Sequence, residues 1–573
     1  MAYIALSYCF IMGTMMPNVA FAQTQADIDA AQRQVEIIQQ QEQQRIQQDQ
    51  EAARRRSEHV NGMDTQPLVP KIAVPGIGAT CRDINEITIK DAPHLYSSVR
   101  KQINREFAGR CLNVGDIERI LTIITKDYID RGYITTRAYL PPQDLSKGHL
   151  EILVIEGTVE KILIQDGNSK SISIRNVFPG IEGNVLNLRD LEQGIEQINR
   201  LISNNARLDI QPGEKPGEST VVVNNQPQPR LHLSLSLDNQ GQSATGKQQT
   251  GITGSADNLL GFDENVSLTH RESTPGDPAS KFARSDNLNI NIPFGYSTLS
   301  LGSSYSQYAS TILLPSGLTL VSSGNSKYDN VRLDRVVYRS QVTRASLAAT
   351  LTTKESNNYL DGQYLGVSSR NLTTLDMDGT LNTALAGGVI SVNLGYTRGL
   401  SAMGALQDPD GLPDSAPHAQ FSKFKYGFNY SRPFRVLNKD LSFTSQLTGQ
   451  ASNEVLYSTE QILIGGLYSV RGFVNNVLSG DDGYYWRNEV SLYQPMSIGS
   501  EMISSRLYVG YDTGAVRNSD PTIPQGHLAG MAVGISANWR GATWDFFNTR
   551  TLSLPSSMTK ESSQTWFRVA YSF

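Results

Sequence analysis

The residue with the most specific chemistry in this chain is Arg471, a lone cation in an apolar segment bordered by glycines. It lies in QILIGGLYSVRGFVNNVLSGDDGYYWRNE, residues 461–489, between Val470 and the pair Gly472-Phe473. The glycines permit tight turns with positive φ, so the segment can fold back and present one arginine at a defined place. A guanidinium keeps its charge and offers five donors, so a buried Arg471 requires a carboxylate partner.

Asp512, in RLYVGYDTGAV, is the best candidate for that partner. Leu507 and Val509 alternate with small or polar residues, which in a strand places Asp512 on the face opposite the apolar side chains. The neighbours of the carboxylate are Gly510, Tyr511 and Gly514. Asp512 is therefore a candidate partner of Arg471, although SVRGF alone also fits a surface hairpin with an exposed arginine.

At these two segments the sequence resembles the transporter component of two-partner secretion systems, the haemolysin/filamentous haemagglutinin secretion-activation family of the outer-membrane assembly-protein superfamily. The stretches GDDG, residues 480–483, and RNE, residues 487–489, follow in the order expected for that family. The resemblance implies that the VRGF tip folds into the lumen of a barrel. It also implies that Arg471 meets Asp512 as the aspartate of an F-x-D-x-G-type motif on the inner wall. Tyr511 directly before that aspartate is a small departure from the pattern.

The elements that must hold these residues alternate with a period of two between residues 229 and 573. Examples are LHLSLSL from Leu231, VISVNLGY from Val389 and WFRVAYSF at the end of the sequence. A soluble β-sandwich alternates too, but strands of about 9–11 residues with one apolar face also suit a transmembrane barrel. The region has room for roughly 14–18 such strands. The resemblance implies sixteen, so we expect a mainly β fold with a 16-stranded transmembrane β-barrel and an inward-folded loop near residues 461–489.

The last strand carries a further feature of the family. Phe567, Val569, Tyr571 and Phe573 share one face of an extended chain. This ending resembles the recognition signal for insertion into the outer membrane.

Two regions before the barrel, residues 80–157 and 158–228, read as small α+β domains. In the first, the helical spacing of Ile117, Ile120 and Ile124 predicts a helix with Asp116 as its N-cap. The segment GYITTRAYLPPQDLSKGHLEILVIEG, which ends at Gly157, is very similar to part of the first POTRA (polypeptide-transport-associated) domain of haemolysin-secretion transporters. The resemblance implies two periplasmic POTRA domains, although each could be a generic strand-and-helix fold.

The chain has three cysteines: Cys9, Cys81 and Cys111. Cys9 falls in an apolar N-terminal stretch, and an even pair in an exported protein suggests a disulfide. Two free thiols or a metal site are the alternatives, and no histidine lies near the pair with zinc-ligand spacing. The spacing of Cys81 and Cys111 is also that of the resembled family, so we expect a disulfide and no metal.

Residues 1–22 read as a signal peptide that ends in Ala20-Phe21-Ala22, although no Lys or Arg precedes Arg33. Residues 23–58 are glutamine-rich with few helix breakers and predict one polar helix. The resemblance implies that this helix plugs the barrel, and a disordered tail or an exposed coiled coil is the alternative. Residues 59–79, rich in Pro and Gly, read as a linker.

Composition and motifs argue against several other classes. A net charge of -5 with 18% charged residues is unremarkable, and we expect no nucleic-acid partner. Mean hydropathy is -0.32 and no apolar run is long enough for a helical span beyond the N-terminus. We find no GxSxG, P-loop, HExxH or dinucleotide motif, so we expect no enzyme and no cofactor. Asp481 and Asp482 read as solvated turn residues.

The resemblance then implies an outer-membrane translocator whose N-terminal domains lie in the periplasm. It would bind the N-terminal secretion domain of a large exoprotein, of haemolysin, adhesin or contact-dependent toxin type, and export it without nucleotide hydrolysis. Strand addition to a sheet edge is the expected mode of recognition. Membrane lipids and the barrel-assembly machinery are the other expected partners of a monomer. An insertase of the same superfamily, which folds other barrels, and a passive porin are the alternatives.

Overall fold

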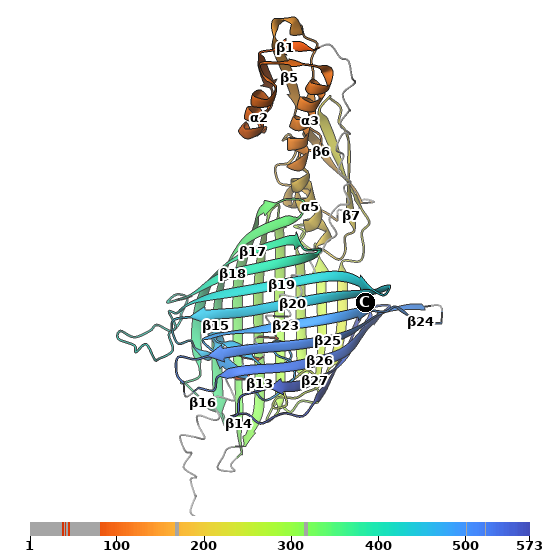
Figure 1. Cartoon of the computed structure of the whole chain (residues 1–573). Helices are drawn as coiled ribbons and strands as arrows, with labels where there is room; N and C mark the ends of the chain where they lie inside the picture. Colours follow the sequence, from red (N-terminus) through yellow and green to blue (C-terminus); the bar gives the residue numbers. More distant parts are fainter. Residues whose placement is uncertain are drawn as a thin grey trace, which may run out of the picture.

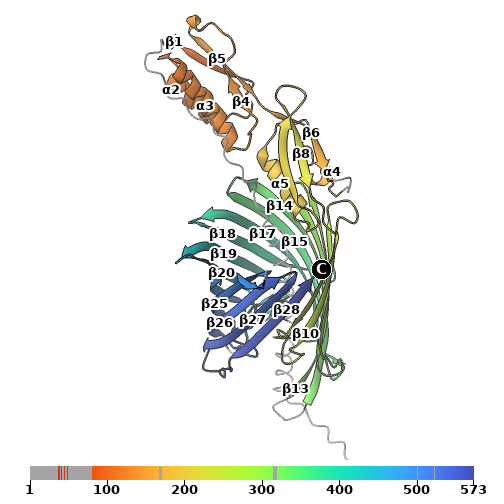
Figure 2. The ribbon, with the colours of Figure 1, turned by 90° about the vertical axis from the view of Figure 1, so that its right-hand side faces the viewer.

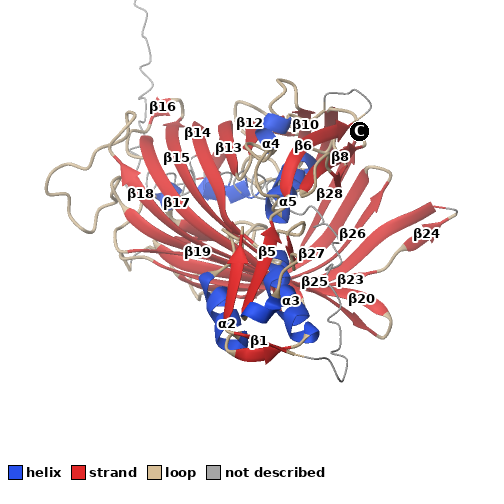
Figure 3. Cartoon of the chain, turned by 90° about the horizontal axis from the view of Figure 1, so that it is seen from above, coloured by secondary structure: helices blue, strands red, loops and turns tan. Residues whose placement is uncertain are grey.

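A computed structural model describes residues 37–38, 40–41, 44–45, 48, 81–166, 171–313, 319–499, 501–521 and 523–573. Two small α+β domains stand at one end of a large β-barrel (Figures 1 and 2). Seen from above, both domains lie over that end of the barrel (Figure 3). In the part of the chain described, no helix has both the length and the apolar character needed to cross a membrane.

The barrel is closed by sixteen antiparallel strands. The first eight are β9 (Leu231–Asp238), β10 (Gln249–Asp257), β11 (Asn265–Ser273), β12 (Phe282–Phe294), β13 (Ser297–Leu313), β14 (Thr319–Arg339), β15 (Thr343–Leu360) and β17 (Arg370–Leu385). The others are β18 (Gly388–Leu400), β19 (Ser422–Val436), β20 (Lys439–Ser452), β23 (Asp482–Tyr493), β25 (Glu501–Arg517), β26 (Gly526–Trp539), β27 (Ala542–Ser553) and β28 (Gln564–Ser572). Two short strands, β16 (Gln363–Tyr364) and β24 (Met496–Ile498), add to β15 and β25.

The two ends of the barrel differ in their connections. On the side of the small domains the turns are short, as at residues 295–296, 386–387 and 437–438. Most connections at the other end are longer, and residues 453–481 form the longest of them. Short periplasmic turns and long outer loops are typical of outer-membrane barrels, so this asymmetry places the small domains on the periplasmic side.

The outer surface of the barrel is apolar because the apolar side chains of the alternating strands point outward. On β9, Leu231, Leu233 and Leu235 are exposed, whereas Ser234 and Ser236 point to the better-covered inner side. A continuous apolar outer surface of this kind suits a lipid environment. The expected mainly β fold with a 16-stranded transmembrane barrel is confirmed.

The C-terminal strand closes the barrel against β9. Val569 pairs with Leu237, and the backbone N–H of Phe573 donates to the carbonyl of Leu233 at 2.9 Å. The Phe567 ring stacks on Phe546 with centroids 6.4 Å apart. Two further ring pairs involve this strand: Trp566 stacks on Phe547 with centroids 6.4 Å apart, and Tyr571 lies edge-on to Phe573 with centroids 4.6 Å apart. The four aromatic and apolar residues named from the sequence therefore lie at the seam of the barrel.

Domain 1 consists of the elements from β1 to β5. These are β1 (Arg82–Ile84), β2 (Glu86–Lys90), α2 (Ser97–Phe107), β3 (Arg110–Leu112), α3 (Val114–Asp130), β4 (Arg137–Tyr139), η1 (Leu145–Lys147) and β5 (His149–Ile155). The sheet has the order β2-β5-β4, and Ile117, Ile120 and Ile124 of α3 are buried against it as their spacing predicts. The predicted N-cap Asp116 is wrong, because Asn113 caps α3 and Asp116 completes a capping box from the third helical position.

Cys81 and Cys111 form a disulfide with their Cα atoms 5.3 Å apart. Cys111 lies in β3, whose pairing with β1 places Asp83 opposite it. The bond therefore joins the opening of domain 1 to the strand that leads into α3.

Domain 2 consists of β6 (Thr158–Gln165), α4 (Ile174–Val177), α5 (Leu188–Asn199), β7 (Ala206–Pro212) and β8 (Glu218–Asn225), with sheet order β6-β8-β7. The polar face of α5 rests on the periplasmic turns of the barrel. Gln193 donates to the carbonyl of Gly295 at 3.3 Å, and Glu196 pairs with Arg339 and Arg344. These buried polar contacts fix domain 2 on the rim formed by β12 to β15.

We predict that the disulfide stabilises domain 1 by about 3–4 kcal/mol, the loop-closure entropy expected for some thirty residues. In the unreduced protein a maleimide should label neither cysteine, and prior reduction should lower the urea midpoint at which they become labelled in denaturant. Stoichiometric labelling of both cysteines without reductant contradicts the bond.

Candidate functional site: a loop anchored in the lumen

The inward loop connects β20 to β23 and comprises residues 453–481. Residues 482–489, expected in the loop, instead form the start of β23, where the ladder to β25 pairs them with residues 510–517. Within the loop, β21 (Ile462–Ile464) pairs antiparallel with β22 (Leu478–Gly480). The loop packs its own small core against the barrel wall, made of Ile462, Ile464, Val470, Phe473, Leu478, Tyr485, Val516 and Leu528.

The structure brings Arg471 and Asp512 together on the inner wall. Arg471 Nε donates to Asp512 Oδ2 at 2.6 Å, and Nη2 donates to Oδ1 at 2.9 Å. The backbone N–H of Arg471 also donates to Oδ2 at 3.0 Å. Asp512 is 0% exposed and Arg471 5%. The pair is therefore a buried, bidentate contact with a third hydrogen bond that fixes the loop backbone.

Glu489 extends this contact into a charge cluster. Its Oε2 accepts from Arg471 Nη1 at 3.0 Å, and its Oε1 accepts from Arg506 Nη1 at 3.1 Å. Sequence reasoning named Glu489 only as the end of RNE. Its spacing two residues from Arg487 on β23 places both on the lumen face, which is the signal that could have assigned it to the site.

Missing side chains make room for the loop tip. A Cβ on Gly510 would lie 2.1 Å from Arg471 Nη2, and one on Gly530 would lie 1.7 Å from the Arg471 carbonyl oxygen. Gly472 has φ +112°, and a Cβ there would lie 2.7 Å from the carbonyl oxygen of Arg550. The backbones of the wall and the tip are thus too close for a side chain between them. The sequence around Gly530 gives no signal of this contact.

The other motif residues fall on two faces. Val470 and Phe473 are buried in the core of the loop, and a Cβ on Gly514 would lie 3.1 Å from Val470 Cγ2. Tyr511 is 49% exposed on the outer face of β25. Tyr511 therefore belongs to the lipid-facing surface and does not contact Arg471.

A second carboxylate holds the far side of the tip. Glu561, in the connection between β27 and β28, accepts from the backbone N–H groups of Val474, Asn475 and Asn476 at 2.9, 3.0 and 2.7 Å. Sequence reasoning missed Glu561, because a glutamate in a polar loop is normally solvated and its partners are backbone groups.

The interpretation of Asp481 as a solvated turn residue is wrong. Asp481 is buried, and its Oδ1 accepts from Leu456 N at 2.9 Å and from Gln461 Nε2 at 3.0 Å. These contacts tie the start of the loop to its end. Asp482, in contrast, remains partly exposed and pairs with Arg517.

Most of the predicted helix at residues 23–58 lies outside the described residues. Seven described residues between 37 and 48 have helical backbone, and three glutamines among them donate to loop carbonyls. Gln44 Nε2 donates to Leu463 O at 3.2 Å, and Gln48 Nε2 donates to Tyr468 O at 2.7 Å. On the other side Arg45 Nη2 donates to Ser285 Oγ of β12 at 2.8 Å. These residues therefore lie in the lumen, between the loop and the wall.

Beside the loop the lumen contains a cavity of about 870 Å³. Its lining is mainly polar and includes Asn330, Thr350, Thr380, Asn393, Gln446 and Thr448. In the described residues no three His, Cys, Asp or Glu side chains are grouped as metal ligands. A cavity with this lining offers hydrogen-bonding side chains to a polar, extended chain.

Comparison with known proteins gives a consistent result. The family described as haemolysin secretion/activation protein ShlB/FhaC/HecB matches residues 217–537. The ShlB-type POTRA domain matches residues 83–157, and a second POTRA domain matches residues 158–212.

Curated relatives and solved structures agree with these matches. The chain is 32% identical over 529 residues to the outer membrane transporter CdiB of Dickeya dadantii (strain 3937), covering 91% of each chain. It is 32% identical over 467 residues to the hemolysin transporter protein ShlB of Serratia marcescens, covering 81% of each. The solved structure of CdiB from Escherichia coli has a TM-score of 0.82 at 31% identity and covers 97% of this chain and 100% of that chain.

We predict that Arg471→Lys lowers transport about tenfold or more, although the charge is retained. Lysine cannot reproduce the two parallel hydrogen bonds to Asp512, and one lost hydrogen bond to a charged group costs about 1.5–3 kcal/mol. The measurement is the amount of exoprotein in the medium at matched levels of folded barrel. Arg540→Lys, in the exposed pair with Glu501, is the matched control and should transport normally. Equal transport by both variants means that the bidentate contact does not position the loop.

Proposed function

The chain belongs to the haemolysin secretion/activation protein family ShlB/FhaC/HecB, and we propose that it exports one large partner exoprotein from the periplasm to the cell surface. It is an outer-membrane transporter of the two-partner secretion type, with its POTRA domains in the periplasm. The relatives named above are transporters of a haemolysin or carry the name CdiB. A haemolysin, an adhesin or a contact-dependent toxin is the proposed class of cargo.

The observation that carries this proposal is a polar lumen closed by a removable part of the chain itself. The loop and the helical residues occupy part of the lumen through side-chain contacts and a small apolar core, and the loop is joined covalently to the wall only at its ends, where it continues into β20 and β23. The remaining cavity, about 870 Å³ and lined by Ser, Thr, Asn and Gln side chains together with Lys, Arg, Asp and Glu side chains, suits an unfolded chain in transit. A passive porin has no use for two POTRA domains fixed at its entrance.

Recognition of the exoprotein is proposed to occur at the POTRA domains. Each has a three-stranded sheet that ends on edge strands, β2 and β4 in domain 1 and β6 and β7 in domain 2. An extended segment of the secretion domain can add to such an edge, where main-chain hydrogen bonds give affinity and side-chain pockets give choice.

The transport step needs neither cofactor nor nucleotide in this proposal. Folding of the exoprotein outside the cell removes it from the exit and makes export directional. The protein acts as a monomer among outer-membrane lipids, after the barrel-assembly machinery has inserted it, and has no catalytic activity and no nucleic-acid partner.

The test is export by the purified protein in liposomes without nucleotide. We expect an unfolded exoprotein, encoded next to this chain and carrying its N-terminal secretion domain, to become protected from protease inside the vesicles. The same exoprotein without that domain is the matched control and should remain sensitive. No protection of the complete exoprotein contradicts the proposal. Accelerated folding of unrelated barrels by this protein supports the insertase instead.

A further inference from the structure

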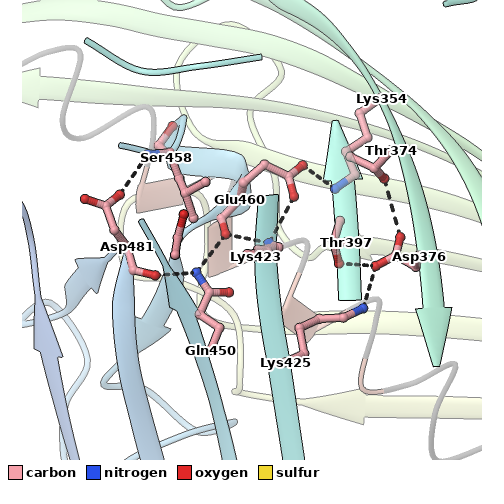
Figure 4. A network of polar contacts seen from close by, with 12 residues as sticks. Lys354, Thr374, Asp376, Thr397, Lys423, Lys425, Gln450, Ser458, Glu460 and Asp481 are labelled. Carbon is pink, nitrogen blue, oxygen red and sulfur yellow. Dashed lines mark hydrogen bonds and ion pairs between the residues drawn. The ribbon is translucent and has the colours of Figure 1, made fainter. Parts of the chain in front are cut away.

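A second charged contact holds the loop at its base, at Glu460. This residue ends the short helix η2 (Ser458–Glu460), and its side chain is 2% exposed. The carboxylate lies between two lysines of the wall: Oε2 accepts from Lys423 of β19 at 3.0 Å, and Oε1 accepts from Lys354 of β15. Figure 4 shows the two ammonium groups on either side of the carboxylate.

The backbone of Glu460 is fixed by the same wall. Lys423 Nζ donates to the Glu460 carbonyl at 2.7 Å, and Gln450 Nε2 of β20 donates to it at 3.0 Å. The Gln450 amide also donates to the carbonyl of Asp481 at 3.0 Å, which joins the two ends of the loop (Figure 4). Three strands of the wall, β15, β19 and β20, therefore converge on one loop residue.

Glu460 is the main ion-pair partner of both lysines. Lys423 and Lys354 are mostly buried, with side chains 9% and 13% exposed. The nearest other carboxylate of the network, Asp376, is bonded to Lys425 and to Thr397. Removal of the Glu460 charge would leave two mostly buried ammonium groups close together without the carboxylate between them, which is unfavourable.

Glu460 lies among the loop carbonyls that bind the helical residues. Gln40 donates to the carbonyl of Ser458, two residues before Glu460, and Gln44 to that of Leu463, three residues after it. Residues four apart lie on one face of a helix, so these glutamines donate hydrogen bonds to one row of loop carbonyls. The position of this row in the lumen depends on where Glu460 is held.

We propose that Glu460 is a positioning residue that, through Lys354 and Lys423, keeps the loop base at the place where its carbonyls bind the helix and the lumen stays closed. This contact is independent of the one at Arg471, since β20 and β23 separate β19 from β25 in the barrel. The loop is thus held at its tip and at its base by two separate charged contacts. The inference rests on the proposed export function only for its biological purpose.

The test is ion conductance of the purified protein in planar bilayers, which requires no exoprotein. Glu460→Gln keeps the shape but removes the charge, and we expect about a tenfold longer open time, the factor for one lost hydrogen bond to a charged group. Glu501→Gln, at an exposed pair with Arg540, is the matched control and should behave as the wild type. Heat-dependent migration on gels verifies that each barrel is folded.

Two further variants separate positioning from general damage. Reversing all three charges, Glu460→Lys with Lys354→Glu and Lys423→Glu, should restore the short open time, because a central charge between two opposite ones is regenerated. Gln40→Ala should lengthen the open time, and its combination with Glu460→Gln should add little, because both act on the same helix contact.

Wild-type open time in Glu460→Gln overturns the inference, as does failure of the folded reversed variant to recover. If Glu460→Gln does not fold, the reversed variant and Gln40→Ala decide in the same way. A protein that shows the expected conductances yet exports no exoprotein leaves this inference standing and contradicts only the proposed function.

Discussion

A buried guanidinium needs hydrogen-bond acceptors, preferably carboxylates, for its donors. The lumen of this barrel is arranged around one such contact, at Arg471. Arg471 receives a carboxylate in bidentate geometry from Asp512 and a second carboxylate from Glu489. The contact forms only if the loop enters the barrel, so the loop is directed inward by the cost of leaving buried Asp512 without the three hydrogen bonds that Arg471 donates. Glycines at 510 and 530 follow from the same constraint, because a side chain at either position would occupy the place of the arginine or its backbone.

The two faces of the barrel wall differ in polarity, and the pair of Arg471 and Asp512 lies on the inner face. The outer face is apolar and the inner face polar, because apolar and polar side chains alternate along strands such as β9 and β25. On β25 this alternation places Tyr511 toward lipid and Asp512 toward the lumen within two consecutive residues. Domain 2 is fixed to the periplasmic rim through α5, so the entrance, the helix contacts and the loop belong to one connected structure.

Elements whose signal lies in residues close together in the sequence could be predicted. The spacing of Ile117, Ile120 and Ile124 predicts α3, and the period of two predicts the barrel strands, although the number sixteen came from the family resemblance. Asp512 is a candidate partner of Arg471 because strand alternation places it opposite the apolar face, but the pairing itself came from the family resemblance. The strand β7 has no clear sequence signal, since ARLDIQP mixes charged residues with a final proline and lacks an apolar run.

The rest depends on contacts between distant segments, which leave no local signal. Glu460, Glu561 and Asp481 look like ordinary solvated carboxylates of polar loops, and their partners come from strands or loops far away in the sequence. The end of the loop was also misplaced, because residues 482–489 carry turn formers at their start yet are bound into the ladder by β25.

The most direct measurement of the central claim is the accessibility of the loop in intact cells. Ser469 is 0% exposed in the loop beside Arg471, so the nearly isosteric Ser469→Cys should be protected from a membrane-impermeant maleimide. Ser562→Cys, on the exposed connection between β27 and β28, should be labelled. Adding Asp512→Ala to Ser469→Cys should make it reactive, because the tip loses its anchor. Labelling of Ser469→Cys as fast as Ser562→Cys in the otherwise unchanged protein would contradict an inward loop held by the pair of Arg471 and Asp512.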